Sequence, residues 1–274
     1  MNLALVFDPL FRVPFANGLL LALVVPLLGA YVRLRSEWLA ALGLAQVTAA
    51  GGVLAVLTGV HPLAGALGAA VAAVAVKGRA ERGGNDAYAL LLLLGWSAAL
   101  LGAANSVKGE ELSHALLDGQ LYFTGWTNLL GALALLATVA AALPWLSRRL
   151  LLERFYPEHL SANGIAVWRI HLGFDVLVAL AVALTTESIG VMATFALVFL
   201  PPWVAFRRAA GWRRALVWAS ALSVACYLVA FSAAILLDQP FGPVYAGVLV
   251  LATLLRLPRS RSAAPARGAE AAAA

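Results

Sequence analysis

Long apolar runs, separated by short charged or turn-forming clusters, dominate this sequence. Nine such runs lie at residues 15–32, 38–59, 62–76, 87–105, 127–146, 170–186, 189–206, 214–237 and 241–257. Most are near the length of about 20 residues that an α-helix needs to cross the bilayer, and they lack the alternation of membrane β-strands. The run at 62–76 is the shortest and begins with Pro62. The pattern predicts an all-α, polytopic transmembrane bundle of about nine spans.

Composition strengthens this prediction and excludes several classes of protein. Hydrophobic residues make up 63% of the 274 positions and charged residues only 12%, whereas soluble domains carry about 25% charge. The single cysteine, Cys226, lies within an apolar run, which excludes a disulfide-bonded secreted scaffold. The chain is therefore expected to be a multi-pass protein of the cytoplasmic (inner) membrane.

The distribution of Lys and Arg predicts the orientation. If successive connections alternate between the two sides of the membrane, every Lys and Arg except Arg12 and Lys108 falls on one side. The positive-inside rule places that side in the cytoplasm, so the N-terminus is predicted outside and the C-terminus inside. The net charge of +6 then reflects topology, and no nucleic-acid partner is expected. Residues 1–257 form the predicted membrane domain, followed by a disordered cytoplasmic tail at 258–274.

Motifs for chemistry are missing from the sequence. It contains no GxxxxGK[ST], HExxH, CxxC or GxSxG, and the predicted spans hold few polar groups that could converge on one site. We therefore expect neither an enzyme nor an ATP site in this chain, and no cofactor.

The longest predicted cytoplasmic connection, residues 147–169, mixes charged residues with large apolar ones. Pro157 and Glu158 are typical of a helix start and Gly164 of a helix end. A short amphipathic helix in this place suits either the membrane surface or the docking of a soluble partner, and the residues alone leave both open.

Four blocks of the sequence resemble membrane subunits of zinc/manganese-type metal ABC importers. Residues 155–165, FYPEHLSANGI, are similar to that family's F-D-P-E-x-A-x-A-x-G-V segment. Residues 117–129 resemble L-F-G-x-I-L-x-V-S-W-x-D-L, residues 190–201 resemble G-x-L-L…A-L-L-V-x-P, and residues 28–35 resemble L-G-S-F-V with the following L-R-R. The blocks occur in the family's order.

The resemblance implies a permease subunit that works with other proteins. It implies a homodimer or heterodimer of permeases, cytoplasmic ABC ATPase subunits that bind ATP, and an extracytoplasmic metal-binding protein. Residues 155–165 correspond to the coupling helix that docks on the ATPase, and Glu158, Ala162 and Gly164 carry over. Tyr156 replaces the family's Asp.

Other residue types stand here at the positions of the family's metal ligands. An Asp and a His four residues apart in the second span correspond to Leu42 and Gln46. Leu42 cannot bind a metal and Gln46 is a weak oxygen ligand for a transition metal. The ligands have moved, or the substrate is a complexed or organic species, or a second permease supplies the site.

Several residues are candidates for a substrate path. Asp175 is an acid well inside a span, where burial is costly, and His171 lies four residues earlier on the same helical face. The pair would contact substrate, or Asp175 would instead be hydrogen-bonded to His171 or Arg169. Glu187 would line the mouth of the path or cap a span. Other candidates with mainly structural alternatives are Glu111, His114, Asp118, His61, His159 and Asp238.

The sequence thus predicts a permease subunit of an ABC importer for a divalent metal ion (zinc, manganese or iron class) or a metal complex. The alternative is a secondary transporter or ion-conducting protein that is independent of ATP.

Overall fold

The computed structural model describes residues 9–79, 84–156, 158 and 166–256. These residues form α-helices and short 3-10 helices, with no strand among them. The α-helices are α1 (Arg12–Leu34), α2 (Ala40–Leu57), α3 (Pro62–Arg79), α4 (Asn85–Ala104), α5 (Val107–Asp118), α6 (Trp126–Phe155), α8 (Val167–Ile189), α9 (Val191–Arg208), α10 (Trp212–Leu237) and α11 (Phe241–Ala252). The 3-10 helices are η2 (Pro9–Phe11), η3 (Leu121–Phe123) and η4 (Thr253–Arg256).

Each predicted apolar run corresponds to one helix, and the all-α prediction is confirmed for the described residues. Seven helices there, α1, α2, α4, α6, α8, α9 and α10, are long and apolar enough to cross a membrane. The segments Pro62–Gly78 and Phe241–Leu255 are apolar but shorter. Nine spans therefore remain a prediction, and so does the orientation. The predicted tail at 258–274 lies outside the described residues.

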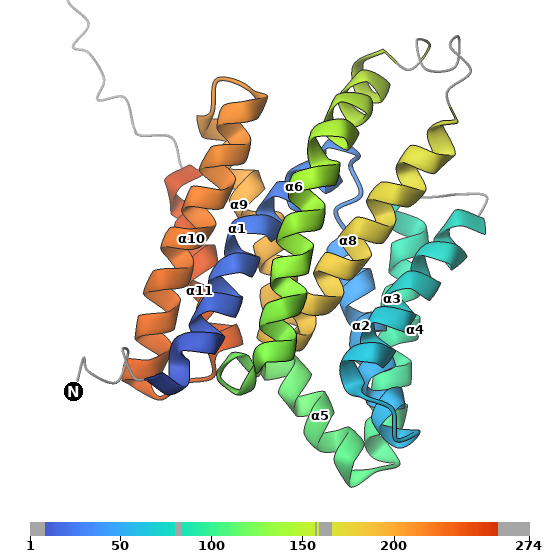
Figure 1. The fold of residues 1–274 in the computed structure, drawn as a ribbon, viewed down its shortest axis with the longest axis vertical. Helices are drawn as coiled ribbons and strands as arrows, with labels where there is room; N and C mark the ends of the chain where they lie inside the picture. The colour runs from blue at the N-terminus through green and yellow to red at the C-terminus, as the bar shows by residue number, and fades with distance from the viewer. Residues whose placement is uncertain (1–8, 80–83, 157, 159–165, 257–274) are drawn as a thin grey trace, which may run out of the picture.

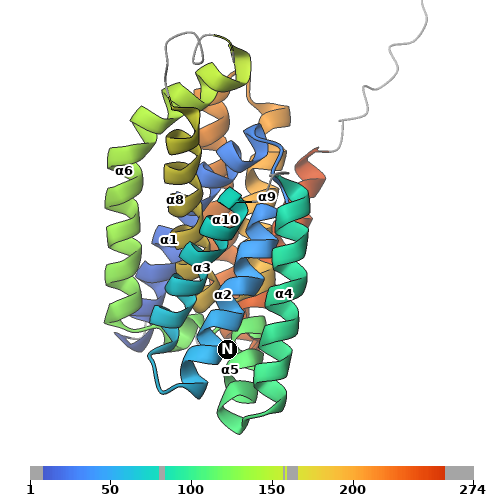
Figure 2. The same ribbon diagram turned by 90° about the vertical axis from the view of Figure 1, so that its right-hand side faces the viewer.

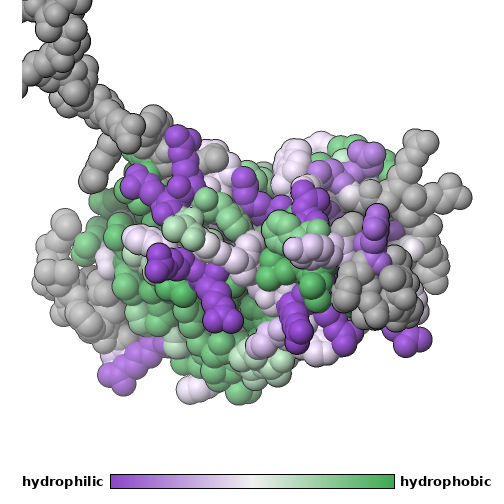
Figure 3. All heavy atoms as spheres, turned by 90° about the horizontal axis from the view of Figure 1, so that it is seen from above, coloured by the Kyte–Doolittle hydropathy of each residue, from purple (hydrophilic) through white to green (hydrophobic). Residues whose placement is uncertain are grey.

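Successive long helices run in opposite directions, so that their ends form two opposite faces of the bundle (Figures 1 and 2). The cation-rich end, at the top of Figure 1, carries the described Lys and Arg residues other than Arg12 and Lys108. Figure 3 looks onto this end and shows hydrophilic side chains gathered over a largely apolar body. Under the positive-inside rule this is the expected cytoplasmic end.

The longest predicted connection differs in extent from the observed one. Helix α6 continues nine residues beyond the apolar run 127–146, to Phe155, and α8 begins at Val167, so residues 156–166 form the connection instead of 147–169. The extension consists mainly of Leu, Arg and Glu, which are good helix formers, and no proline interrupts it before Pro157. The last residues of α6 and the first residues of α8 therefore both lie at the cation-rich end.

Helix α8 joins two groups of helices. Helix α2 packs between α3 and α4, whereas α1 packs on α6, α9 and α10. Helix α8 contacts members of both groups, including α3, α2, α6 and α9, and Figure 1 shows it between them. Small residues permit the close approach, as between Gly51 of α2 and Gly65 of α3, where a Cβ on Gly51 would lie 2.5 Å from the Gly65 carbonyl oxygen. A movement of α8 would therefore be felt in both groups.

Candidate functional site

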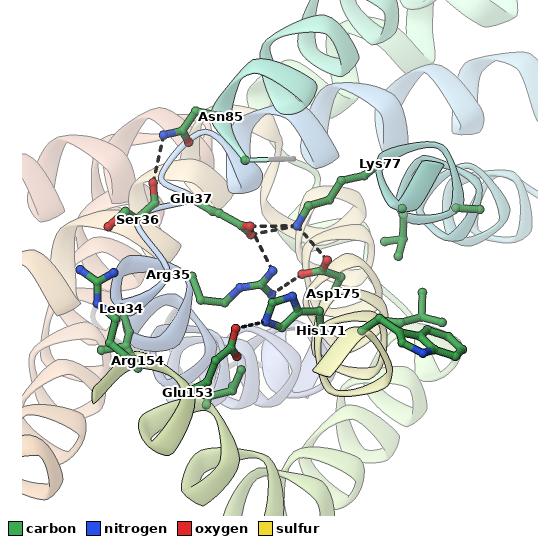
Figure 4. A pocket seen from close by; sticks show the side chains of 17 residues that line it. Leu34, Arg35, Ser36, Glu37, Lys77, Asn85, Glu153, Arg154, His171 and Asp175 are labelled. Carbon is green, nitrogen blue, oxygen red and sulfur yellow. Dashed lines mark hydrogen bonds and ion pairs between the residues drawn. The ribbon is translucent and has the colours of Figure 1, made fainter. Parts of the chain in front are cut away.

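Four side chains at the cation-rich end form a closed ring of alternating charge, here called the ion ring. It consists of Arg35 at the end of α1, Glu37 in the α1–α2 turn, Lys77 of α3 and Asp175 of α8 (Figure 4). Asp175 accepts hydrogen bonds from Arg35 Nη1 at 2.6 Å and Lys77 Nζ at 2.8 Å. Glu37 accepts from Arg35 Nη2 at 3.0 Å and from Lys77 Nζ at 3.0 and 3.1 Å. Each cation therefore contacts both carboxylates.

The ion ring is largely removed from solvent, and its charges balance. Its four side chains are only 7–12% exposed. Burial by itself lowers the pKa of Arg35, but the carboxylates of Asp175 and Glu37 outweigh this effect and raise the pKa above its ordinary value. Two aromatic rings flank the cations, with Arg35 5.4 Å from the Phe174 ring centre and Lys77 4.7 Å from that of Tyr88. The guanidinium of Arg35 is thus held in its charged form.

The turn that carries Arg35 and Glu37 is held in place by α4. Ser36 has a left-handed backbone conformation, φ 61°, which is uncommon for a residue other than glycine. The side chain of Asn85, at the start of α4, donates to the Ser36 carbonyl at 2.9 Å and accepts from the Leu39 N–H at 3.1 Å. These bonds fix a conformation that directs Arg35 toward Asp175 and Glu37 toward Lys77, as Figure 4 shows.

A cavity of about 1090 Å³ opens beside the ion ring, and all four ring residues line it. Further residues of α3, the start of α4, α6 and α8 complete its walls, and α6 and α8 supply Glu153 and His171. His171 Nε2 lies 2.5 Å from Glu153 Oε1. The cavity is therefore polar on several sides, with positive and negative groups close together.

The structure places the predicted pair His171 and Asp175 on one wall of this cavity but gives them separate partners. Asp175 contacts Arg35 and Lys77, whereas His171 contacts Glu153 of α6. The expected alternative, a bond from Asp175 to His171 or Arg169, is not the observed pairing. Because both oxygens of Asp175 already accept bonds from cations, this carboxylate is poorly placed to bind a metal ion in this conformation.

Gln46 and Leu42 lie on α2, away from the ion ring. Gln46 is buried and lines a cavity of about 40 Å³ with residues of α4, α5 and α9, including Leu116 and Val191. Leu42 is half-buried against the apolar core. The space around Gln46 is about that of one water molecule.

Glu187 lies near the opposite end of α8. Its Oε2 is shielded from solvent and has no hydrogen-bond partner among the described residues. Gly52 of α2 lies beside this oxygen, since a Cβ there would be in ordinary contact with it at 3.9 Å. A buried carboxylate oxygen without a partner is costly and points to a ligand or proton. Of the predicted path residues, Glu187 therefore has the strongest unmet demand for a cation.

The remaining candidates do not assemble into a metal site. Among the described residues no group of three or more His, Cys, Asp or Glu side chains is placed to hold a metal ion. His61, Glu111, His114 and Asp238 are exposed, and nothing is described of the Asp118 side chain. Of the predicted coupling residues, Glu158 is helical and exposed. Ala162 and Gly164, like His159, lie outside the described residues.

Sequence reasoning missed three members of the ion ring. It assigned Arg35 and Lys77 to the orientation signal and did not single out Glu37. Two features could have drawn attention to them: Glu37 is an acid amid a basic connection, and Lys77 is one of only two lysines, the other being Lys108.

Comparison with known proteins gives one family and several structures. A sequence model described as the ABC 3 transport family matches residues 8–259. A chain of PsaBC from Streptococcus pneumoniae, solved in complex with Fab, has a TM-score of 0.78 at 15% identity, over 90% of this chain and 91% of that one. An inward-facing structure described as a metal-chelate type ABC transporter has a TM-score of 0.62 at 16% identity, over 89% and 84%. No curated protein matches.

Proposed function

Because this chain belongs to the ABC 3 transport family, we propose that it is the permease subunit of an importer for a divalent metal ion or metal complex. A separate cytoplasmic ABC ATPase would drive it. Zinc, manganese and iron are the substrate class that we propose. The observation that carries the proposal is the family match across residues 8–259, nearly the whole membrane domain.

The fold supports the transport assignment independently of sequence identity. The helical arrangement resembles that of PsaBC over most of both chains. A large cavity reaches the ion ring from the cation-rich end, whereas a much smaller one, about 40 Å³, surrounds Gln46. We therefore assign the large cavity to the cytoplasmic side of the transport path.

The proposed contact with the ATPase lies at the same end. Helix α6 ends there and helix α8 begins there, and residues 156–166 connect them. Glu158 is exposed, which suits a docking residue. We propose that residues 155–165 dock on the ATPase, with Glu158, Ala162 and Gly164 in the contact, and that this chain binds no ATP or other cofactor itself.

We propose that Glu187 contacts the substrate at the other end of the path. Its unpaired, buried oxygen offers a negative charge to a passing cation, and Gln46 would line the path deeper in the bundle. An extracytoplasmic binding protein would deliver the substrate. Because Leu42 and Gln46 are not a strong ligand pair, a second permease, identical or different, would complete the path. Replacement of Glu187 by Gln should lower uptake without lowering the amount of protein in the membrane.

The test of this function uses the chain together with its ATPase. Uptake of radioactive zinc and of radioactive manganese is measured in cells that carry the wild-type ATPase or one with a disabled Walker motif. Loss of uptake with the disabled ATPase supports the ABC importer. Uptake that persists with it, but collapses when the proton gradient is dissipated, supports the secondary transporter instead. Glu158→Arg and Gly164→Trp should reduce uptake while membrane insertion is retained.

A further inference from the structure

The ion ring joins three parts of the bundle through charged contacts. Arg35 and Glu37 belong to the α1–α2 turn, Lys77 to α3 and Asp175 to α8. Asp175 is the contribution of α8, and both of its carboxylate oxygens are used, one for each cation. The bonds of Asp175 therefore tie α8 to the other two parts at a single residue.

Stability alone is a weak explanation for such an arrangement. Removing charges from water costs free energy that their mutual attraction only partly returns, so an apolar replacement of a buried ion pair is often neutral or stabilising. Buried ionic groups are better suited to selecting one arrangement of the elements that carry them. The ion ring fits this use, because it lines a cavity in which its members can separate.

The contacts divide so that, when the ion ring opens, each cation keeps Glu37 as a partner, although one positive charge is then in excess. If α8 moves away by roughly 2 Å, a shift typical of helix movements in switching proteins, both Asp175 contacts pass beyond hydrogen-bonding distance. Arg35 and Lys77 then still share Glu37, through the bonds at 3.0–3.1 Å. Asp175 lines the cavity and would face its water. A closed and an open state of the ion ring would therefore differ in the contacts of one residue, Asp175.

Asp175 lies close along α8 to the segment that is proposed to dock on the ATPase. The helix begins at Val167, directly after residues 156–166, and Asp175 lies eight residues further on, about 12 Å along the helix. A rigid helix carries a displacement over this distance, and the α8 contacts with α3 and α6 place it where both walls of the cavity respond.

We infer that the ion ring is a latch that α8 closes and opens during transport, and that Asp175 is its positioning residue. The inference rests on the proposed function in one respect, that the ATPase displaces residues next to the start of α8. In the closed state seen here, α8 is fixed to α3 and the α1–α2 turn. When ATPase docking moves α8, the Asp175 bonds break together and the cavity walls separate.

The test measures how many ions are taken up for each ATP hydrolysed. The purified complex of this chain with its ATPase is placed in liposomes and supplied with its extracytoplasmic binding protein, with radioactive zinc and radioactive manganese as probes. The key variant is the double substitution Asp175→Asn with Lys77→Met. It removes one anion and one cation, so that Arg35 and Glu37 remain a balanced pair, but α8 loses its charged contacts with α3 and the α1–α2 turn.

The latch predicts that the double variant assembles and hydrolyses ATP but takes up at least about fivefold fewer ions per ATP, the lower end of coupling factors between sites. The single variant Asp175→Glu keeps the charge and should take up more ions per ATP than the double variant does. Arg149→Gln serves as the matched control. It removes a cation at the same end that stacks on Trp145, 3.9 Å from its ring centre, and should leave the ratio unchanged.

Two other outcomes are distinguishable. If the double variant is stable and takes up as many ions per ATP as the wild type, the ion ring is structural and the latch is overturned. If the wild-type complex itself shows no ATP-dependent uptake of either metal, the proposed function fails before the variants are compared.

Discussion

Removing the carboxylate of Asp175 should destabilise the folded protein because it unbalances the ion ring. The substitution Asp175→Asn is nearly isosteric but gives up charge-assisted bonds at 2.6 and 2.8 Å. Arg35 and Lys77 then share Glu37 alone, which leaves one excess positive charge in a site whose side chains are only 7–12% exposed.

The expected magnitude follows from the charge left behind. Breaking a buried pair by removing one partner costs about 3–5 kcal/mol, and the adjoining cavity admits water that favours the lower value. For a protein of this size each kcal/mol shifts the unfolding midpoint by about 2–4 °C. A cost of about 3 kcal/mol therefore corresponds to a decrease of roughly 6–12 °C in Tm.

The double variant provides the internal comparison. Lys77→Met alone leaves two carboxylates with one Arg35 and should be destabilising by a similar amount. Combined with Asp175→Asn, it restores a neutral Arg35–Glu37 pair, so the double variant should be more stable than either single variant. Thermal unfolding of the detergent-solubilised protein, followed by size-exclusion chromatography with fluorescence detection, measures all three. Additive decreases in Tm would refute the charge-balance argument.

Two pairs of glycine substitutions, each a test with its control, probe the packing. Gly51→Val should destabilise the α2–α3 contact by about 1–3 kcal/mol, since its Cβ would lie 2.5 Å from the Gly65 carbonyl oxygen. Gly68→Val on α3 meets open space and should be tolerated. Equal yields of folded protein from the two variants would contradict this. Gly119→Ala should cost about 1–3 kcal/mol of folding free energy and lower Tm, because φ is 81° and the new Cβ would meet the Ile189 carbonyl. Gly125→Ala, with free space around its Cβ, should leave Tm unchanged.

The helices were predictable because membrane spans are long and apolar. Each of the nine runs corresponds to a helix, and their ends differ from the predicted ones by only a few residues in most cases. The largest difference is at α6, which continues to Phe155. Hydropathy detects where a helix meets charged residues, not where its hydrogen bonding stops, and Leu, Arg and Glu continue a helix readily.

The candidate site was only partly predictable for a different reason. Asp175 was recognisable because an acid within an apolar helix is costly and needs a partner. Its partners were not, since Arg35 lies 140 positions away and Lys77 lies 98, and the hydrophobic pattern does not encode which helices become neighbours. His171 and Asp175 both line the large cavity, but their partners come from other elements. Helix α6 supplies Glu153 to His171, and the turn after α1 supplies Arg35 to Asp175.

The central claim is that this membrane bundle moves a metal substrate with energy from a separate ATPase. It is tested most directly by the initial rate of zinc and manganese uptake into liposomes that contain the purified complex, with the extracytoplasmic binding protein added outside. ATP or a non-hydrolysable analogue is enclosed in the liposomes, on the side that the ATPase faces. We predict uptake with ATP and background levels with the analogue. Equal uptake under both conditions, in liposomes that retain an unrelated small solute, would contradict the account.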